Sequence, residues 1–196
     1  MHVSKTREPI FNVPAVVVVL LAVLALVHAL RVFVLSPEAD RVFVWTFAFV
    51  PARYEWNELF ASGWEYGWAI WTFVTYALIH ANLMHIGFNA VWLLAFGSAV
   101  ARRFGTWRFL VFSALTAAAG ALAQLMSLFF SDLVSHTASN VDDLAPMIGA
   151  SAAISGTMGA AARFAFQRGG PLDPWHRNGE RAYLLPAPPF RVTMRD

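Results

Sequence analysis

Four long apolar stretches, joined by shorter polar segments, constrain this 196-residue chain more than any other feature of its sequence. A helix that crosses the hydrocarbon core of a membrane needs about 20 apolar residues, each adding about 1.5 Å of rise. The composition agrees, since 58% of the residues are hydrophobic and only 13% are charged. The sequence therefore predicts an all-α integral membrane protein, a helical bundle with spans at about 13–35, 82–100, 109–130 and 147–166.

Composition also excludes several classes of function. A formal net charge of +2 gives no electrostatic support for nucleic-acid binding. The chain has no cysteine, which excludes disulfides, thiolate metal sites and a cysteine nucleophile. Lys5 and Arg7 precede the first apolar stretch as in a signal peptide, but that stretch is too long and lacks a small-x-small cleavage site. We therefore expect a retained span, with His28 as a helix contact and Arg31 snorkelling to the interface.

The positive charges fall on one side of the predicted bundle: before span one, between spans two and three, and after span four. They are Lys5, Arg7, Arg102, Arg103, Arg108, Arg163, Arg168, Arg177 and Arg181. By the positive-inside rule, both termini are then cytoplasmic. We expect a cytoplasmic lead at 1–11, a membrane domain at 12–166, and a polar, Pro/Gly-rich tail or inter-helix loop at 167–196. The long connection 36–67 mixes acids with Trp and Tyr, which favours a segment in the membrane interface.

Polar side chains inside apolar stretches are costly in lipid and indicate a site. His85 and Asn89 are four residues apart in span two, so they share a helix face. That span is expected to end at Arg102 and Arg103. Pro146 is expected to open span four, which would place Ser151 roughly 7 Å below that opening. Spans two and four both start on the outer side, so their polar groups should lie at a similar depth.

Two interpretations of this pattern stay open. A histidine and an asparagine on one face can donate hydrogen bonds to a developing oxyanion, but polar residues also hydrogen-bond between helices in membrane bundles. The small residues Gly149, Gly156 and Gly159 around Ser151 are equally typical of close helix packing. A haem site is disfavoured because His80 and His85, five residues apart, would lie about 140° apart around a helix. A metal site is disfavoured because no carboxylate or thiolate accompanies the imidazoles.

Taken together, the motifs resemble those of a rhomboid intramembrane serine protease of bacterial type. The resemblance covers most of the chain, from the long first loop to the end of span four, and includes the Arg103–Gly105 turn. Rhomboids carry H-x4-H-x3-N in the second core helix, matched here by His80, His85 and Asn89. They carry G-x-S-G in the fourth, with glycines five and eight residues after the serine. The matching residues are Gly149, Ser151, Gly156 and Gly159, with Ala152 in place of the motif glycine.

This resemblance implies a Ser–His dyad inside the membrane. Ser151 would be the nucleophile, and its backbone amide would contribute to an oxyanion hole. His85 and Asn89 would complete that hole, while His80 would support the site. Ser155 is a rival nucleophile, but the downstream glycine spacing fits Ser151.

The general base of this family is a histidine on the sixth core helix, which the four predicted spans do not include. A serine hydroxyl without a base is a weak nucleophile. The other histidines are poorly placed to replace it, and these are His2, His28, His136 and His176. We therefore expect an N-terminal fragment or truncated product of a six-helix protease, inactive as given.

The resemblance thus implies hydrolysis of transmembrane protein substrates by acyl transfer through Ser151, with no cofactor and no metal. It implies a multi-pass protein of the bacterial inner membrane, whose partners are its substrates and the lipid bilayer, with no nucleic acid. The sequence indicates no oligomeric state. The alternative is a non-catalytic rhomboid-like protein that binds transmembrane helices. A transporter or channel subunit is disfavoured because the two halves lack a corresponding pair of broken helices.

Overall fold

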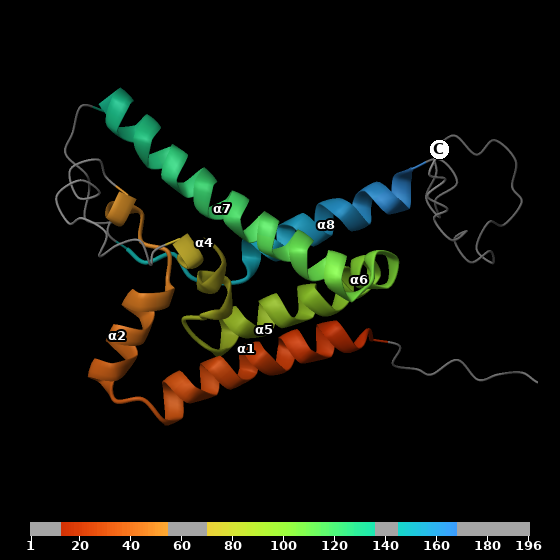
Figure 1. The fold of residues 1–196 in the computed structure, drawn as a ribbon, viewed down its shortest axis with the longest axis horizontal. Coiled ribbons are helices and arrows are strands. Elements are labelled where there is room, and N and C mark those ends of the chain that lie inside the picture. Colours follow the sequence, from red (N-terminus) through yellow and green to blue (C-terminus); the bar gives the residue numbers. More distant parts are fainter. Residues whose placement is uncertain (1–12, 55–69, 136–144, 168–196) are drawn as a thin grey trace, which may run out of the picture.

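The described part of the chain is a bundle of helices (Figure 1). The computed structural model describes residues 13–54, 70–135 and 145–167, and within them it contains helices and one isolated β-bridge, between Phe49 and Met147. The predicted lead 1–11 and the predicted tail after Gln167 lie outside these residues. The all-α class predicted from the sequence is therefore confirmed for the described residues.

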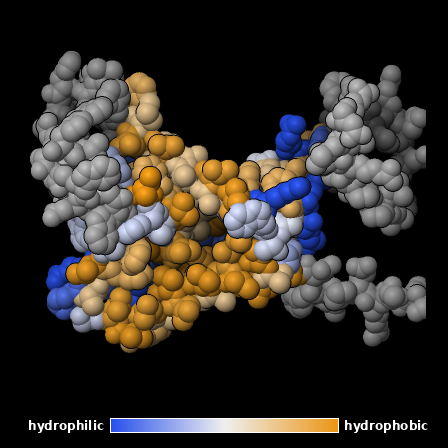
Figure 2. Space-filling model, viewed as in Figure 1, coloured by the Kyte–Doolittle hydropathy of each residue, from blue (hydrophilic) through white to orange (hydrophobic). Residues whose placement is uncertain are grey.

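Within residues 13–54, 70–135 and 145–167, three helices are long and apolar enough to cross a membrane. They are α1 (Ala15–Phe33), the continuous helix Leu83–Phe104, and the Thr106–Ser127 part of α7 (Thr106–Ser135). Large apolar side chains on these helices point outward, among them Leu26, Phe33 and Leu115. Figure 2 shows an apolar band across the helices, with hydrophilic residues toward its two ends. This is the surface of an integral membrane protein.

The helix that carries the histidine motif consists of three consecutive segments: α5 (Leu83–Trp92), the π-helix η4 (Leu93–Gly97) and α6 (Ser98–Phe104). It continues past residue 100, so the prediction that Arg102 and Arg103 end it is wrong. Arginines suit the last turn of a helix because they complement the negative end of its dipole. The helix ends instead at Gly105, whose φ of 74° favours glycine.

The fourth helix of the bundle is shorter than predicted. α8 (Ser151–Phe166) has 16 residues and ends where the sequence predicts. Pro146 does not open it, because Met147 pairs with Phe49 and Gly149 has a φ of 113°, which no α-helix allows. The count of four spans is therefore not confirmed. Ser151 lies at the start of α8 and not five residues inside it, so the helix rise from Pro146 does not give its depth.

The first connection contains a helix that the sequence analysis missed, α2 (Pro37–Phe47). Its N-cap residue Ser36 accepts a hydrogen bond from the Ala39 amide at 3.2 Å, and Pro37 occupies the first turn. Serine followed by proline is a recognised helix start, so the signal was present in the sequence. The described residues between α2 and α5 include the short helices η1 (Pro51–Tyr54), α4 (Thr72–Thr75) and η3 (Tyr76–Leu78).

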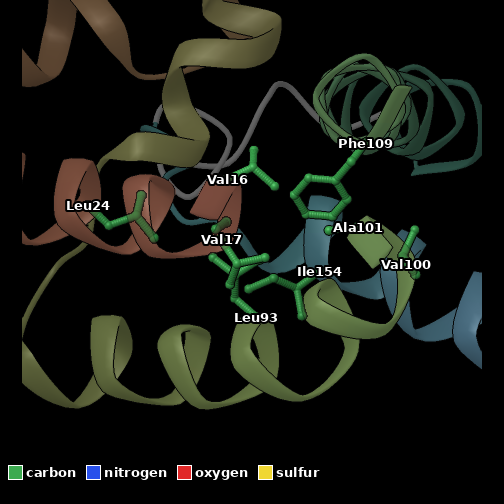
Figure 3. Packing of buried hydrophobic residues seen from close by; sticks show 9 residues of the cluster. Val16, Val17, Leu24, Leu93, Val100, Ala101, Phe109 and Ile154 are labelled. Carbon is green, nitrogen blue, oxygen red and sulfur yellow. The ribbon is translucent and has the colours of Figure 1, made fainter. Parts of the chain in front are cut away.

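The main core lies where α1, the Leu83–Phe104 helix, α7 and α8 meet. In Figure 3, Val17 of α1, Leu93 of η4 and Ile154 of α8 point toward one another, with Phe109 of α7 above them. Phe109 and Val17 are fully buried. This packing fixes the first turns of α8 against the helix that carries the histidine motif.

Small residues allow α7 and α8 to approach closely. A Cβ atom on Gly120 of α7 would collide with the methyl group of Ala152, and one on Gly156 of α8 would collide with Thr116. Glycine is needed where helix backbones come this close. The methyl group of Ala152, at the position where the G-x-S-G pattern has glycine, is therefore accommodated by Gly120 opposite it.

Candidate active site

The first turns of α5 fix His85 and Asn89. Asn82, the N-cap residue, accepts a hydrogen bond from the His85 amide at 2.9 Å. Asn89 is buried, and its Nδ2 donates to the His85 carbonyl at 3.0 Å. The two residues lie one turn apart on the same face of the helix, as the four-residue spacing requires.

The loop before α8 passes directly against the imidazole of His85. A Cβ atom on Gly149 would lie 2.5 Å from His85 Nε2 and 2.7 Å from Cε1, so no side chain fits there. The φ of Gly149, 113°, is also one that other residues rarely adopt. The Gly149 amide donates to the carbonyl of Tyr76 at 3.0 Å, which fixes this loop conformation.

His80 holds the next residue of the same loop. It precedes α5, is fully buried, and accepts a hydrogen bond at Nε2 from the Ala150 amide at 3.4 Å. The ring centroids of His80 and His85 are 5.0 Å apart, with their planes at 68°. The two histidines therefore contact consecutive residues of the loop, His85 at Gly149 and His80 at Ala150.

Ser151 follows these two residues and begins α8, where it is exposed. Amides in the first turn of a helix lack intrahelical partners, and the positive end of the helix dipole favours an anion there. Ser155, one turn later, is also exposed. Among the described residues no hydrogen bond joins the Ser151 hydroxyl to a histidine. The histidines therefore contact the residues that precede Ser151, Gly149 and Ala150, and not the Ser151 hydroxyl.

The two ring nitrogens of His85 have different neighbours. Nδ1 accepts a long hydrogen bond, 3.5 Å, from the Ala81 amide. Nε2 is the ring atom closest to the Cβ position of Gly149. A neutral imidazole has one donor and one acceptor nitrogen, so an accepting Nδ1 leaves the proton on Nε2. His85 therefore presents an N–H donor toward the loop that carries Ser151.

Burial is the largest of the causes that together lower the pKa of His80 to about 4, and the neighbouring groups His85, His28 and Arg31 make smaller contributions in the same direction. A neutral His80 is the form that can accept the Ala150 amide proton. The environment of this histidine therefore favours the state in which it holds the loop.

Tyr76 is a part of the site that the sequence analysis missed. Its carbonyl holds the Gly149 amide, and its buried hydroxyl donates to the carbonyl of Ala117 in α7 at 2.9 Å. It therefore ties the loop to a transmembrane helix. The available signal was a tyrosine within the apolar segment that precedes the histidine motif.

Two predictions for α1 have different outcomes. His28 is buried, as expected of a residue in contact with other helices. The snorkelling expected for Arg31 is wrong, because its side chain is only 11% exposed and pairs with Asp40 of α2. An acidic partner nine residues away removes the need to reach bulk water.

Among the described residues, no group of three or more His, Cys, Asp and Glu side chains is arranged to hold a metal ion. His136, considered at the sequence level as a substitute base, lies outside those residues.

Two comparisons with known proteins bear on this site. A sequence profile of the Rhomboid domain matches residues 67–177, more than half of the chain. The chain is also similar to the rhomboid protease GlpG of Enterobacter sp. (strain 638), with 35% identity over 63 residues. That match covers 30% of this chain and 23% of the relative, so the chain matches less than a quarter of the length of that protein.

Proposed function

This chain belongs to the rhomboid family, and on that premise we propose that it is a serine endopeptidase that hydrolyses transmembrane protein substrates within the membrane. One observation carries the proposal. The imidazoles of His85 and His80 contact Gly149 and Ala150, the two residues that immediately precede Ser151. A serine at an exposed helix start, two residues after a glycine that contacts a histidine with an N–H donor, suits acyl transfer.

In the proposed reaction, the Ser151 hydroxyl oxygen attacks the scissile carbonyl carbon and loses its proton to a base. The resulting oxyanion receives hydrogen bonds from His85 Nε2, Asn89 Nδ2 and the Ser151 amide. When the intermediate collapses, the amine leaves with the proton, and water then hydrolyses the acyl-enzyme. His80 keeps the loop in place through the Ala150 amide. The resemblance assigns the base to a histidine of a further helix, so the proposal concerns the nucleophile and the oxyanion hole.

The experiment is cleavage of a transmembrane substrate in proteoliposomes by this chain joined to the base-bearing core helix of the family, and by the S151A and S155A variants of that protein. We expect S151A to abolish cleavage and S155A to retain it, because only Ser151 directly follows the loop held by the histidines. Cleavage by S151A would place the nucleophile elsewhere. Circular dichroism of each variant controls for folding.

The alternative function is binding of transmembrane helices without hydrolysis. The exposed face of α8 favours it, since Ser155 and Gly159 are small and a Cβ atom on Gly159 would meet no neighbour. Small residues on an exposed face let another helix approach closely in a membrane. Photo-crosslinking of a substrate helix to α8, with no cleavage by the wild type, would support this function over the protease.

We also propose the finer topology. Helix α8 (Ser151–Phe166) would form a fourth, short span together with the loop before it, the membrane domain would extend over 12–166, and both termini would be cytoplasmic in a bacterial inner membrane. In Figure 1 the start of α1 and the end of α8 lie on the same side of the bundle, which supports two termini on one side. Arg102, Arg103 and Arg163 near the ends of α6 and α8 support a cytoplasmic side.

A further inference from the structure

We propose that Arg31 is a positioning residue for His85, acting through the peptide bond between His80 and Ala81. The inference rests on the proposed function only for its effect on Ser151. Its structural content, a chain of hydrogen bonds from α1 to the imidazole, stands independently.

The series of hydrogen bonds begins at a partly buried ion pair between α1 and α2. Arg31 donates from Nε to Asp40 Oδ1 at 2.6 Å and from Nη2 to Oδ2 at 3.1 Å. The side chains of Arg31 and Asp40 are 11% and 29% exposed. A two-bond pairing of this kind fixes the plane of the guanidinium and directs its remaining donors. Asp40 therefore aims the third nitrogen of Arg31.

That third nitrogen reaches the segment that leads into α5. Arg31 Nη1 donates to the carbonyl of His80 at 2.9 Å. The amide on the other side of the same peptide bond belongs to Ala81, and it donates to His85 Nδ1 at 3.5 Å. One peptide unit thus accepts from a cation at its oxygen and donates to the imidazole at its nitrogen.

The effect of Arg31 passes through this peptide unit to His85. A cation at a peptide oxygen polarises the unit and strengthens its N–H as a donor, because hydrogen bonds in a chain reinforce one another. A stronger donor at Ala81 holds Nδ1 of His85 as an acceptor, which keeps the proton on Nε2. Nε2 is the nitrogen beside Gly149, in the loop that leads to Ser151. Arg31 therefore influences which His85 nitrogen can donate to an oxyanion, without touching the site itself.

The matched control lies on α2. Arg41 pairs with Glu38 at 3.5 Å, and both side chains are more than 70% exposed. R41Q removes the arginine of this exposed pair, which takes no part in the hydrogen bonds that join Arg31 to His80. R31Q removes the positive charge that begins this series of hydrogen bonds. R31K keeps a positive charge but cannot form the two-bond geometry with Asp40.

The test is hydrogen exchange at the Ala81 amide, followed by NMR of labelled protein in nanodiscs, together with ring-nitrogen spectra of His85. Ala81 is exposed and lines an open cavity of about 500 Å³, so exchange at its amide reports its own hydrogen bond. In the wild type we expect His85 Nδ1 to be unprotonated. In R31Q we expect exchange at Ala81 to be about tenfold faster, with an intermediate rate in R31K and the wild-type rate in R41Q.

Unchanged exchange at Ala81 in R31Q, or a protonated Nδ1 in the wild type, would overturn the inference. A rise in exchange that extends to the amides of α7 would also overturn it, because Arg31 would then act only on overall stability. Reaction of Ser151 with a fluorophosphonate should slow about tenfold in R31Q. If the wild type takes no label while Ala81 exchange responds as expected, the proposed function fails and the positioning role stands.

Discussion

The imidazole of His85 lies so close to Gly149 that a Cβ atom on this glycine would be 2.5 Å from Nε2. The contact joins α5 to the loop before α8, although the two residues are far apart in the sequence. It also explains why the serine motif begins with glycine, since the same residue has a φ of 113°.

G149A should destabilise the protein and slow reaction at Ser151. The new methyl group would collide with His85, and the positive φ costs about 1–3 kcal/mol for a residue with a side chain. The measurement is unfolding in detergent together with fluorophosphonate labelling. G87A is the control, because Gly87 lies in α5 with no neighbour near its Cβ position, and alanine there should stabilise the helix by roughly 0.5–1 kcal/mol. Equal stability of G149A and wild type would contradict the contact.

The pairing of Gly120 with Ala152 predicts a compensating swap. G120A alone should destabilise by about 1–3 kcal/mol, because its methyl group would collide with that of Ala152. The double variant G120A/A152G moves the methyl group across the interface and should recover most of that loss. A double-mutant cycle of unfolding free energies measures the coupling. Additive effects of the two substitutions would mean that α7 and α8 do not meet at these residues.

Stability should fall as the pH drops from about 6.5 toward 4. The pKa of His80 is lowered to about 4 in the folded protein, whereas an unfolded histidine has a pKa near 6.5. The unfolded state therefore binds the proton first, and protonation favours unfolding across this window, by roughly 3 kcal/mol in total. Above pH 6.5 the effect is absent.

H80Q should flatten that pH dependence, since glutamine retains an acceptor for the Ala150 amide but does not titrate. The measurement is the unfolding free energy at pH 7.5, 6 and 4.5 for both proteins. An identical slope in H80Q and wild type would assign the pH dependence to other groups.

The sequence predicted the helical class and the shared helix face of His85 and Asn89, for a physical reason. Apolar length specifies a span, and the spacing of His85 and Asn89 specifies a shared helix face. The role of Ser151 as their partner comes from the resemblance, because spacing alone leaves it open, and it stays a prediction. The start of α8 was mispredicted because proline suits a first turn, while the bridge between Met147 and Phe49 depends on tertiary contact.

The Arg31–Asp40 pair could not be predicted from helix length and hydropathy. The two residues lie on different helices, and the turn between them decides whether they meet. A cation near the end of an apolar stretch is equally consistent with snorkelling. By contrast, α2 was predictable, because Ser36 and Pro37 form a local helix start that needs no tertiary information.

The most direct test of the central claim is to locate the adduct formed by a fluorophosphonate on the protein in nanodiscs, by mass spectrometry of its peptides. The account predicts an adduct on Ser151, absent in S151A, retained in S155A, and formed roughly 100-fold more slowly in H85A, which lacks the Nε2 donor. An adduct on Ser155, or equal rates in wild type and H85A, would contradict the claim that Ser151 reacts at a site completed by His85.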